Sequence, residues 1–269
     1  MSTCLKSLAA CILFAAAASA QAPVIGGLAN NYSYIAAGLP NYGIAQGSIF
    51  DIFGTNLAGS SLSQSVPLKT TLNGVTINVT VGGTTTHPIP YYVTATLIGA
   101  ILPSATPVGT GTITVTTGAG TSATFPIVVV ASAFGILTLN QAGTGLAAAF
   151  DVNYNYLGYT NAANPGDTII LWGSGLGPVT GDETVTQTQQ NLTNIPIEID
   201  IGGISANVSY HGRSLYPGLD QINVAVPQNV LAGCSVSVVV RTGNYVSNVA
   251  TVPVAPAAGA PAPTPRPAA

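Results

Sequence analysis

The sequence predicts an all-β protein built from two tandem Ig-like antiparallel β-sandwich domains. Three observations predict this class: apolar and polar residues alternate along short runs, signals for helices are almost absent, and the chain repeats itself. Runs such as "TTLNGVTINVTVGG" and "CSVSVVVRTGNYVSNVATVPV" are rich in Val, Ile and Thr, and Gly, Pro and Asn end them at short intervals. The 269 residues are enough for two domains that each bury a core of their own.

The internal repeat begins with one phrase that occurs twice. "GSIFDIFGTNLAGSSL" starts at Gly47, and "GDTIILWGSGLGPVTG" starts at Gly166. In each copy we expect an early strand and a glycine-built turn, with Phe53 and Trp172 directed toward the core. The repeat continues with "INVTVGG" and "IEIDIGG", and then with "LIGAILPSATPVGTGTITVTT" and "QINVAVPQNVLAGCSVSVVVRT".

Residues 1–20 have the pattern of a secretory signal peptide. Lys6 supplies a positive start, and the apolar run that follows is too short to span a bilayer. "ASA", which ends at Ala20, fits the small-residue cleavage pattern. We therefore predict a secreted protein, and an uncleaved anchor is the alternative that the short apolar run opposes.

The remainder divides into two sandwiches and a tail. We place domain 1 at 21–132 and domain 2 at 133–254, with the boundary near Ala133. Residues 255–269 are rich in Pro and Ala, so we expect an extended, polyproline-like spacer without a core. No apolar stretch after the signal is long enough for a membrane-spanning helix.

The composition limits the possible partners. Charged residues make up 5% of the chain, whereas about 25% is usual. The formal net charge is −3, so nothing attracts nucleic acid or an anionic membrane electrostatically. Weak repulsion between copies favours self-association.

Four segments carry a resemblance to a known family: "IAQGSIFDIFGTNLA", "NAANPGDTIILWGSGLGPV", "IGGISANVSYHG" and "LDQINVAVPQNVLAG". They resemble the secreted C-terminal domain family that is abundant in Solibacter and other Acidobacteria, which is related to Ig-like and IPT-type sandwiches. The resemblance covers about residues 25–254, and the first copy diverges, with "TLIGAILP" in place of the QIN-type strand. It implies a tandem sandwich and secretion, and it supplies no catalytic residues.

Acids, bases and nucleophiles for catalysis are scarce. The densest polar cluster, "YHGRSLYPGLD", contains His211, Ser214 and Asp220, from which a Ser–His–Asp triad can be drawn. No strand–turn–helix elbow surrounds Ser214. We therefore favour a structural loop in which Arg213 binds Asp220 or a backbone carbonyl, and we predict no enzymatic activity and no cofactor.

Calcium takes carboxylate and carbonyl oxygens from loops. Two acidic pairs are the places to look: Asp182 with Glu183, and Glu198 with Asp200, which share one face of an expected strand. The second pair can equally face water, and neither pair gathers the roughly six oxygens that calcium needs. We predict no metal site.

Tyrosines are the remaining candidates for binding, with eleven in the chain against one Trp and six Phe. Tyrosine offers flat contact area and a hydroxyl at low entropic cost, which suits stacking on sugars and contact with proteins. Half-buried rings at the sandwich ends are the alternative. Those in expected loops or edges are Tyr32, Tyr34, Tyr42, Tyr91, Tyr92, Tyr154, Tyr156 and Tyr159. The residues selected as ligand contacts are Tyr154, Tyr156, Tyr159, His211, Arg213 and Tyr216.

We expect a secreted, non-enzymatic structural or adhesive protein of the cell exterior. Its expected partners are copies of itself, in a homo-oligomer or filament, or extracellular matrix and polysaccharide. An extracellular carbohydrate-binding module that uses the Tyr-rich loops is the alternative.

Nearly uncharged strand edges favour pairing with a second chain. Residues 21–36 either complete their own first sheet or add to the edge of a neighbour, which would build a filament. Cys234, the one cysteine after the signal, is either a small buried side chain or forms a disulfide between chains.

Overall fold

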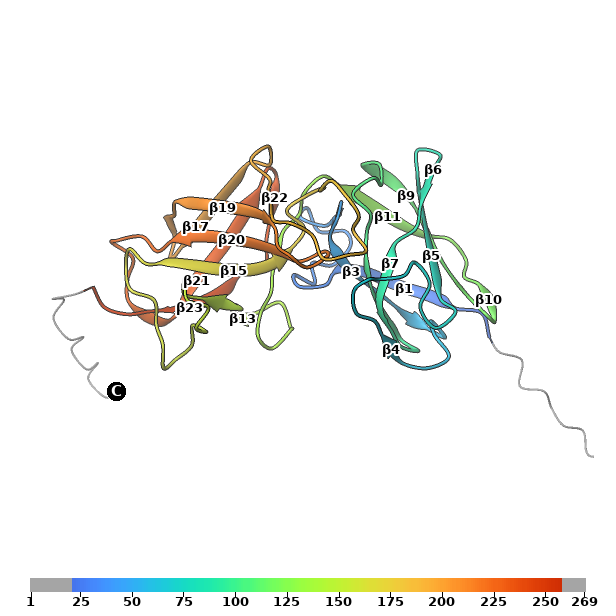
Figure 1. Ribbon diagram of the computed structural model, residues 1–269, viewed down its shortest axis with the longest axis horizontal. Helices are drawn as coiled ribbons and strands as arrows, with labels where there is room; N and C mark the ends of the chain where they lie inside the picture. Colours follow the sequence, from blue (N-terminus) through green and yellow to red (C-terminus); the bar gives the residue numbers. More distant parts are fainter. Residues whose placement is uncertain (1–20, 258–269) are drawn as a thin grey trace, which may run out of the picture.

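The computed structural model describes residues 21–257 (Figure 1). All regular structure in this range is β, arranged in four sheets, so the predicted all-β class is confirmed. In Figure 1 the first half of the chain, blue to green, and the second half, yellow to red, form two lobes side by side. The predicted signal peptide, 1–20, and most of the predicted spacer, 258–269, lie outside the described residues. Within 21–257 there is no helix long and apolar enough to cross a membrane.

The first lobe is a sandwich of two sheets. One has the strand order β1-β3-β8-β7-β4, and the other has the order β2-β11-β9-β5-β6, with β10 beside β9. Neighbouring strands are antiparallel except β2 and β11. The strands are β1 (Val24–Asn30), β2 (Ile44–Ala45), β3 (Ile49–Thr55), β4 (Leu62–Ser63), β5 (Thr76–Val81), β6 (Thr84–Thr86), β7 (Ile89–Val93), β8 (Leu97–Ile101), β9 (Gly109–Thr117), β10 (Gly120–Thr121) and β11 (Phe125–Val130).

The second lobe is built in the same way. Its sheets have the orders β12-β15-β20-β19-β16, with β14 beside β15, and β13-β23-β21-β17-β18, with β22 beside β21. Here β13 is the strand that runs parallel to its neighbour, β23. The strands are β12 (Gly135–Ile136), β13 (Gly145–Leu146), β14 (Ala149–Phe150), β15 (Thr168–Ser174), β16 (Gln190–Asn191), β17 (Ile197–Ile201), β18 (Ile204–Ser205), β19 (Val208–Arg213), β20 (Asp220–Ala225), β21 (Gly233–Thr242), β22 (Tyr245–Val246) and β23 (Ala250–Val254).

The two lobes share one topology, which confirms the internal repeat. Each strand of the first lobe has a counterpart at the same place in the second, and β14 is the single addition among the described strands. The repeated phrase forms β3 in one lobe and β15 in the other. The matching glycine pairs 82–83 and 202–203 all have φ between +56° and +82°. A two-residue hairpin turn needs this left-handed conformation.

Each lobe buries an apolar core between its two sheets, and strand alternation decides which side chains enter it. On β3 the core-facing residues are Phe50 and Ile52, both fully buried. Phe53 is 37% exposed, and Trp172 is half-buried on the face of β15 opposite Leu171. The prediction that Phe53 and Trp172 point into the core is therefore wrong, because both are one residue out of step with the core-facing positions.

The N-terminal segment stays in its own lobe. β1 pairs with β3, with Val24 opposite Thr55 and Asn30 opposite Phe50. Of the two alternatives for residues 21–36, pairing within their own sheet is the one found. Exchange of this segment between copies, which would build a filament, would require β1 to leave β3.

Cys234 is exposed near the start of β21. The pairing of β21 with β23 is irregular between Gly233 and Val236, and burial along β21 begins only at Val236. The buried alternative for Cys234 is therefore wrong, and a disulfide between chains stays a prediction.

Buried hydrogen bonds join the two lobes. Ser174 Oγ accepts from the backbone N–H of Ile49 at 2.8 Å and donates to the carbonyl of Gly218 at 2.6 Å. Asn30 Nδ2 donates to the carbonyl of Ser174 at 3.1 Å. Because these groups are out of water, losing a partner would leave a costly unpaired polar group. The hydrogen bonds therefore connect β1 and β3 of the first lobe to β15 and the loop before β20 of the second.

A loop of the second lobe adds a clamp to this junction. The carboxylate of Glu183 accepts from the backbone N–H and the hydroxyl of Ser104, each at 2.8 Å. Ser104 Oγ in turn accepts from the N–H of Val179 at 2.9 Å. The acid that the sequence marked as a possible calcium ligand thus binds the first lobe instead.

Candidate functional site

A buried ion pair organises the junction from the second lobe. Arg213 ends β19, and its register partner Asp220 begins β20. Arg213 Nε lies 2.7 Å from Asp220 Oδ1, and both side chains are 0% exposed. Asp220 Oδ2 also accepts from the N–H groups of Gly175 and Leu176, and Arg213 Nη2 donates to the carbonyl of Gly47 at 2.8 Å. The predicted bonding of Arg213 to Asp220 or a carbonyl is confirmed, and both bonds are present.

Asn30 shapes the segment that follows β1. Its Oδ1 accepts from the N–H groups of Tyr32 and Ser33, at 2.9 and 3.1 Å. The N–H of Tyr34 donates to the carbonyl of Asn30 and closes the turn. Tyr34 has φ of +51°, which a bulky residue rarely adopts. This turn presents two tyrosines at the junction of the lobes.

Three register partners form a row across the first sheet. Asp51 on β3 lies opposite Gly99 on β8, and Gly99 lies opposite Tyr92 on β7. A Cβ atom on Gly99 would lie 2.3 Å from Tyr92 Cε1, so only glycine leaves room for the ring above β8. The Tyr92 hydroxyl donates to Asp51 Oδ1 at 2.9 Å, and Asn31 Nδ2 donates to the same oxygen at 2.7 Å.

Asn31 and Tyr92 line a cleft of about 340 Å³ at the junction of the lobes, which we name the tyrosine cleft. Ligand sites commonly measure about 300–1,000 Å³, so this one suits a small ligand or a short stretch of a polymer. The first lobe contributes four tyrosines, and the second contributes one aliphatic and one amide side chain. The lining residues are Asn31, Tyr32, Tyr34, Ile49, Tyr91, Tyr92, Leu97, Leu137 and Gln141. Flat rings beside a few hydroxyl and amide groups are typical of a binding site.

A buried carboxylate lies directly behind this wall. Asp51 is 0% exposed, and no hydrogen bond to its Oδ2 is found among residues 21–257. Neither of the two ion pairs within 21–257 includes it. Burial raises the pKa of Asp51, and the polar contacts with Asn31, Tyr92 and Tyr34 partly offset that rise. Burial also raises the pKa of Tyr92, and the charge of Asp51 adds to the effect.

We expect Asp51→Asn to raise the melting temperature at neutral pH. Because the folded pKa of Asp51 is raised above the unfolded value, the folded chain binds more protons between the two values, and stability falls as pH rises through that interval. Asparagine does not titrate, and it keeps an oxygen for Asn31 and Tyr92. The gap in melting temperature should be widest above the folded pKa and should narrow as pH falls toward the unfolded pKa. Thermal unfolding followed by circular dichroism tests this, and a gap independent of pH would contradict it.

The three predicted tyrosines of the second lobe lie apart from the cleft. Tyr154 and Tyr159 are 58% and 69% exposed, in the segment between β14 and β15. Tyr156 packs edge-on against Phe150, with ring centroids 5.9 Å apart. None of the three lines the tyrosine cleft.

The structure separates the predicted cluster around His211. His211 Nε2 lies 3.0 Å from the carbonyl of Ile195, and Ser214 Oγ accepts from the N–H of Tyr216. Tyr216 is 59% exposed, whereas Arg213 is fully buried. Selecting Arg213 as a ligand contact is therefore wrong, because its guanidinium is out of reach of solvent.

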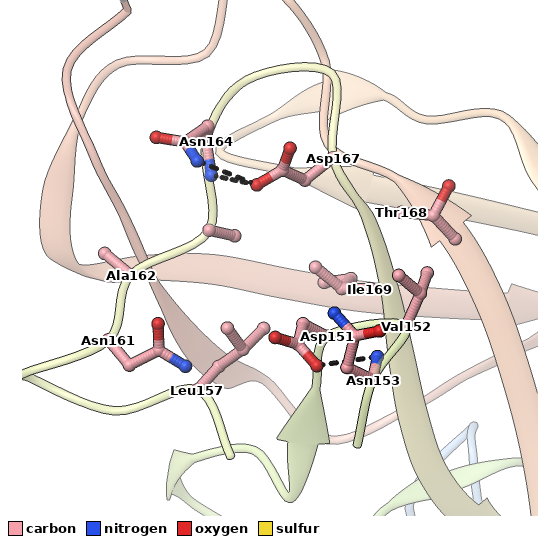
Figure 2. A pocket seen from close by; sticks show the side chains of 11 residues that line it. Asp151, Val152, Asn153, Leu157, Asn161, Ala162, Asn164, Asp167, Thr168 and Ile169 are labelled. Carbon is pink, nitrogen blue, oxygen red and sulfur yellow. Dashed lines mark hydrogen bonds between the residues drawn. The ribbon is translucent and has the colours of Figure 1, made fainter. Parts of the chain in front are cut away.

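A second hollow, of about 280 Å³, lies beside the start of β15 (Figure 2). Asp151 accepts from the N–H of Asn153 at 2.8 Å, and Asp167 accepts from the N–H and Nδ2 of Asn164. Figure 2 shows Asn164 and Asp167 turned toward each other at its rim. Both carboxylates close local turns, and no aromatic ring lines the hollow. The tyrosine cleft is therefore the stronger candidate.

The acids considered for calcium have partners within the chain. Asp182 Oδ1 accepts from the N–H and hydroxyl of Thr184. Glu198 forms an exposed ion pair with Arg241, with 3.6 Å between Oε2 and Nε. In the part of the chain that the structure describes, no three His, Cys, Asp or Glu side chains are placed to hold a metal ion.

The four tyrosines of the cleft were among the tyrosines expected in loops or edges. The tyrosines selected as ligand contacts were others: Tyr154, Tyr156, Tyr159 and Tyr216. No role was predicted for Asp51. The available signal was one acid inside the apolar strand "IFDIF", since a buried charge without a partner is costly and calls for a reason.

Fold and site together define a tandem β-sandwich protein with a tyrosine-lined cleft at the junction of its two lobes. No family model and no curated protein matches the chain. One similar solved structure is SGBP-B from the mixed-linkage glucan utilization locus of Bacteroides ovatus, in complex with a mixed-linkage heptasaccharide. It is 15% identical, with 82% of this chain and 45% of that chain covered and a TM-score of 0.33.

Two further structures show a likeness of the same order. The surface glycan-binding protein PbSGBP-B from Prevotella bryantii is 13% identical, with 86% and 42% of the two chains covered and a TM-score of 0.25. Domains 5–6 of the S-layer protein SbsC are 16% identical, with 86% and 98% covered and a TM-score of 0.24. The chain spans less than half the length of the two glycan-binding proteins. At these identities the likeness concerns the fold alone.

Proposed function

We propose that this chain is a secreted, non-enzymatic binding protein of the cell exterior that holds polysaccharide in the tyrosine cleft. The observation that carries the proposal is the convergence of four tyrosines with Asn31 and Gln141 at the junction of the lobes. Tyrosine faces stack on the apolar faces of sugar rings, while amides and hydroxyls bond to sugar hydroxyls. Holding matrix polysaccharide is the adhesive role that we propose.

The cleft is built before any ligand arrives. Asn30 fixes the turn that carries two of its tyrosines and ties that turn to the second lobe. A site that is already ordered loses less conformational entropy on binding. Burial raises the pKa of Tyr32, Tyr34 and Tyr92, so their hydroxyls stay protonated and can donate hydrogen bonds.

The lining supports binding without hydrolysis. Cleavage of a glycosidic bond commonly uses a pair of carboxyl groups on either side of the bond. The residues that line the cleft include no carboxylate, histidine or cysteine, and Asp51 is a single buried acid behind them. We also propose membership of the secreted family abundant in Acidobacteria. Self-assembly through residues 21–36 is not part of the proposal, because β1 is already paired with β3.

We expect the double substitution Tyr34→Ala and Tyr91→Ala to weaken polysaccharide binding at least about tenfold, because large aromatic contacts each contribute on the order of 1–3 kcal/mol. Tyr159→Ala is the matched control, since Tyr159 is 69% exposed and does not line the cleft. Retardation of the mature chain in native gels containing a panel of neutral and amino polysaccharides measures the effect. The proposal fails if the parent chain is retarded by none of them, or if Tyr159→Ala weakens retardation as much as the double variant.

A further inference from the structure

The tyrosine cleft adjoins a negative charge that no cation within residues 21–257 balances. The cations among the described residues are Lys69, Arg213 and Arg241, and none of them lines the cleft. Arg213 is already paired with Asp220. A buried carboxylate without a cation is unfavourable, so the fold keeps Asp51 at a cost in stability.

This carboxylate stands one side chain behind the wall of the cleft. Its two hydrogen-bond donors, Asn31 and Tyr92, are themselves lining residues. Burial raises the pKa of Tyr32 most, and Tyr91, Asp220 and Asp51, in that order, add to the rise. The carboxylate of Asp51 therefore lies close enough to act electrostatically on a side chain that lines the cleft.

Aromatic rings attract cations, as the carboxylate does. The face of an aromatic ring carries negative potential and attracts a cation within about 6 Å of the ring centroid. Four tyrosine rings line one cleft of about 340 Å³. A ligand with a compact positive charge would balance the negative charge of Asp51.

We propose that the cleft selects sugars with a free, protonated amino group, such as the glucosamine units of deacetylated chitin, over their neutral counterparts. The inference rests on the proposed function and names the charge class of the ligand at the same site. The ammonium group lies against the tyrosine faces and is balanced by Asp51. Acetylation of the amine removes the positive charge, so the neutral sugar keeps only stacking and hydrogen bonds.

Isothermal titration calorimetry on the mature chain tests the inference. The probes are the disaccharide of glucosamine and the disaccharide of N-acetylglucosamine, in a near-neutral buffer, because a more acidic one would protonate Asp51, whose pKa burial raises. Short probes avoid the many charges of a polymer. We expect the amine form to bind at least about tenfold tighter, and we expect added salt to reduce this advantage.

Two acid-to-amide variants locate the charge that matters. Asp51→Asn should remove most of the preference for the amine form. Asp200→Asn is the matched control, because Asp200 is an exposed acid on β17 and its loss changes the net charge by the same amount. The Asp200→Asn variant should keep the preference for the amine form. If Asp51→Asn does not fold, the two disaccharides on the parent chain and the loss of amine binding in Tyr91→Ala still decide the matter.

The outcomes separate the two proposals. Equal binding of both disaccharides, or tighter binding of the acetylated one, overturns the charge preference and leaves polysaccharide binding standing. Loss of the preference in Asp200→Asn as well assigns it to net charge and overturns the role of Asp51. Absence of binding to either disaccharide, together with no retardation by any polysaccharide in the panel, overturns both proposals.

Discussion

Replacing Arg213 with alanine is expected to lower the free energy of unfolding by about 3–5 kcal/mol, the usual cost of breaking a buried ion pair. The substitution leaves the carboxylate of Asp220 buried without its cation. It also removes the bond from Nη2 to the carbonyl of Gly47, so the first lobe loses one of its fixed points on the second. Denaturant unfolding followed by the fluorescence of Trp172 measures the change.

The chain supplies a matched control for this prediction. Arg241 pairs with Glu198 at 3.6 Å, and both side chains are largely exposed. An exposed pair contributes only about 0–1 kcal/mol, so Arg241→Ala should be nearly neutral. An equal loss of unfolding free energy in Arg213→Ala and Arg241→Ala would show that Arg213 does not hold the junction. A further consequence is weaker polysaccharide binding in Arg213→Ala, although Arg213 touches no part of the cleft.

The strands and the repeat could be predicted because they depend on local pattern. Alternation along "INVTVGG" and "IEIDIGG" reports one buried face, and β5 and β17 follow it. The pairing of Arg213 with Asp220 was also within reach, since the two residues lie seven apart on the strands of one hairpin.

Which side chains of β3 point into the core could not be predicted in the same way. Phe50, Asp51 and Ile52 are all 0% exposed, so both faces of this strand are covered. A strand buried on both sides loses the contrast between apolar and polar positions, and the aromatic residue gives no direction by itself. Phe53 was therefore assigned to the wrong face.

The cleft could not be predicted from the sequence, for a different reason. Its residues run from Asn31 to Gln141 and meet through strand register and through contact between lobes. Neither follows from spacing along the chain. The polar cluster around His211 drew attention because its residues are consecutive, yet the fold turns Arg213 inward to the junction and leaves Tyr216 in solvent.

Gly99→Ala should combine a loss of stability with a loss of binding. The backbone of β8 is held by β3 on one side and β7 on the other, so the new methyl group, 2.3 Å from Tyr92 Cε1, forces the ring to move. Asp51 Oδ1 then keeps only the bond from Asn31, and the cleft loses one of its aromatic walls. A weakened hydrogen bond to a buried charge costs on the order of 1–3 kcal/mol.

A double-mutant cycle with Tyr92→Ala separates this clash from the general effect of glycine replacement. If the glycine serves to admit the ring, Gly99→Ala should cost little once the ring is gone, and the coupling energy should be about 0.5–3 kcal/mol. Gly27→Ala on β1 is the control, because a Cβ atom there meets nothing within 4 Å, and alanine at such a position is neutral or slightly stabilising. Additive costs in the cycle would mean that Gly99 does not make room for Tyr92. The row from Asp51 through Gly99 to Tyr92 would then not be what holds this wall of the cleft in place.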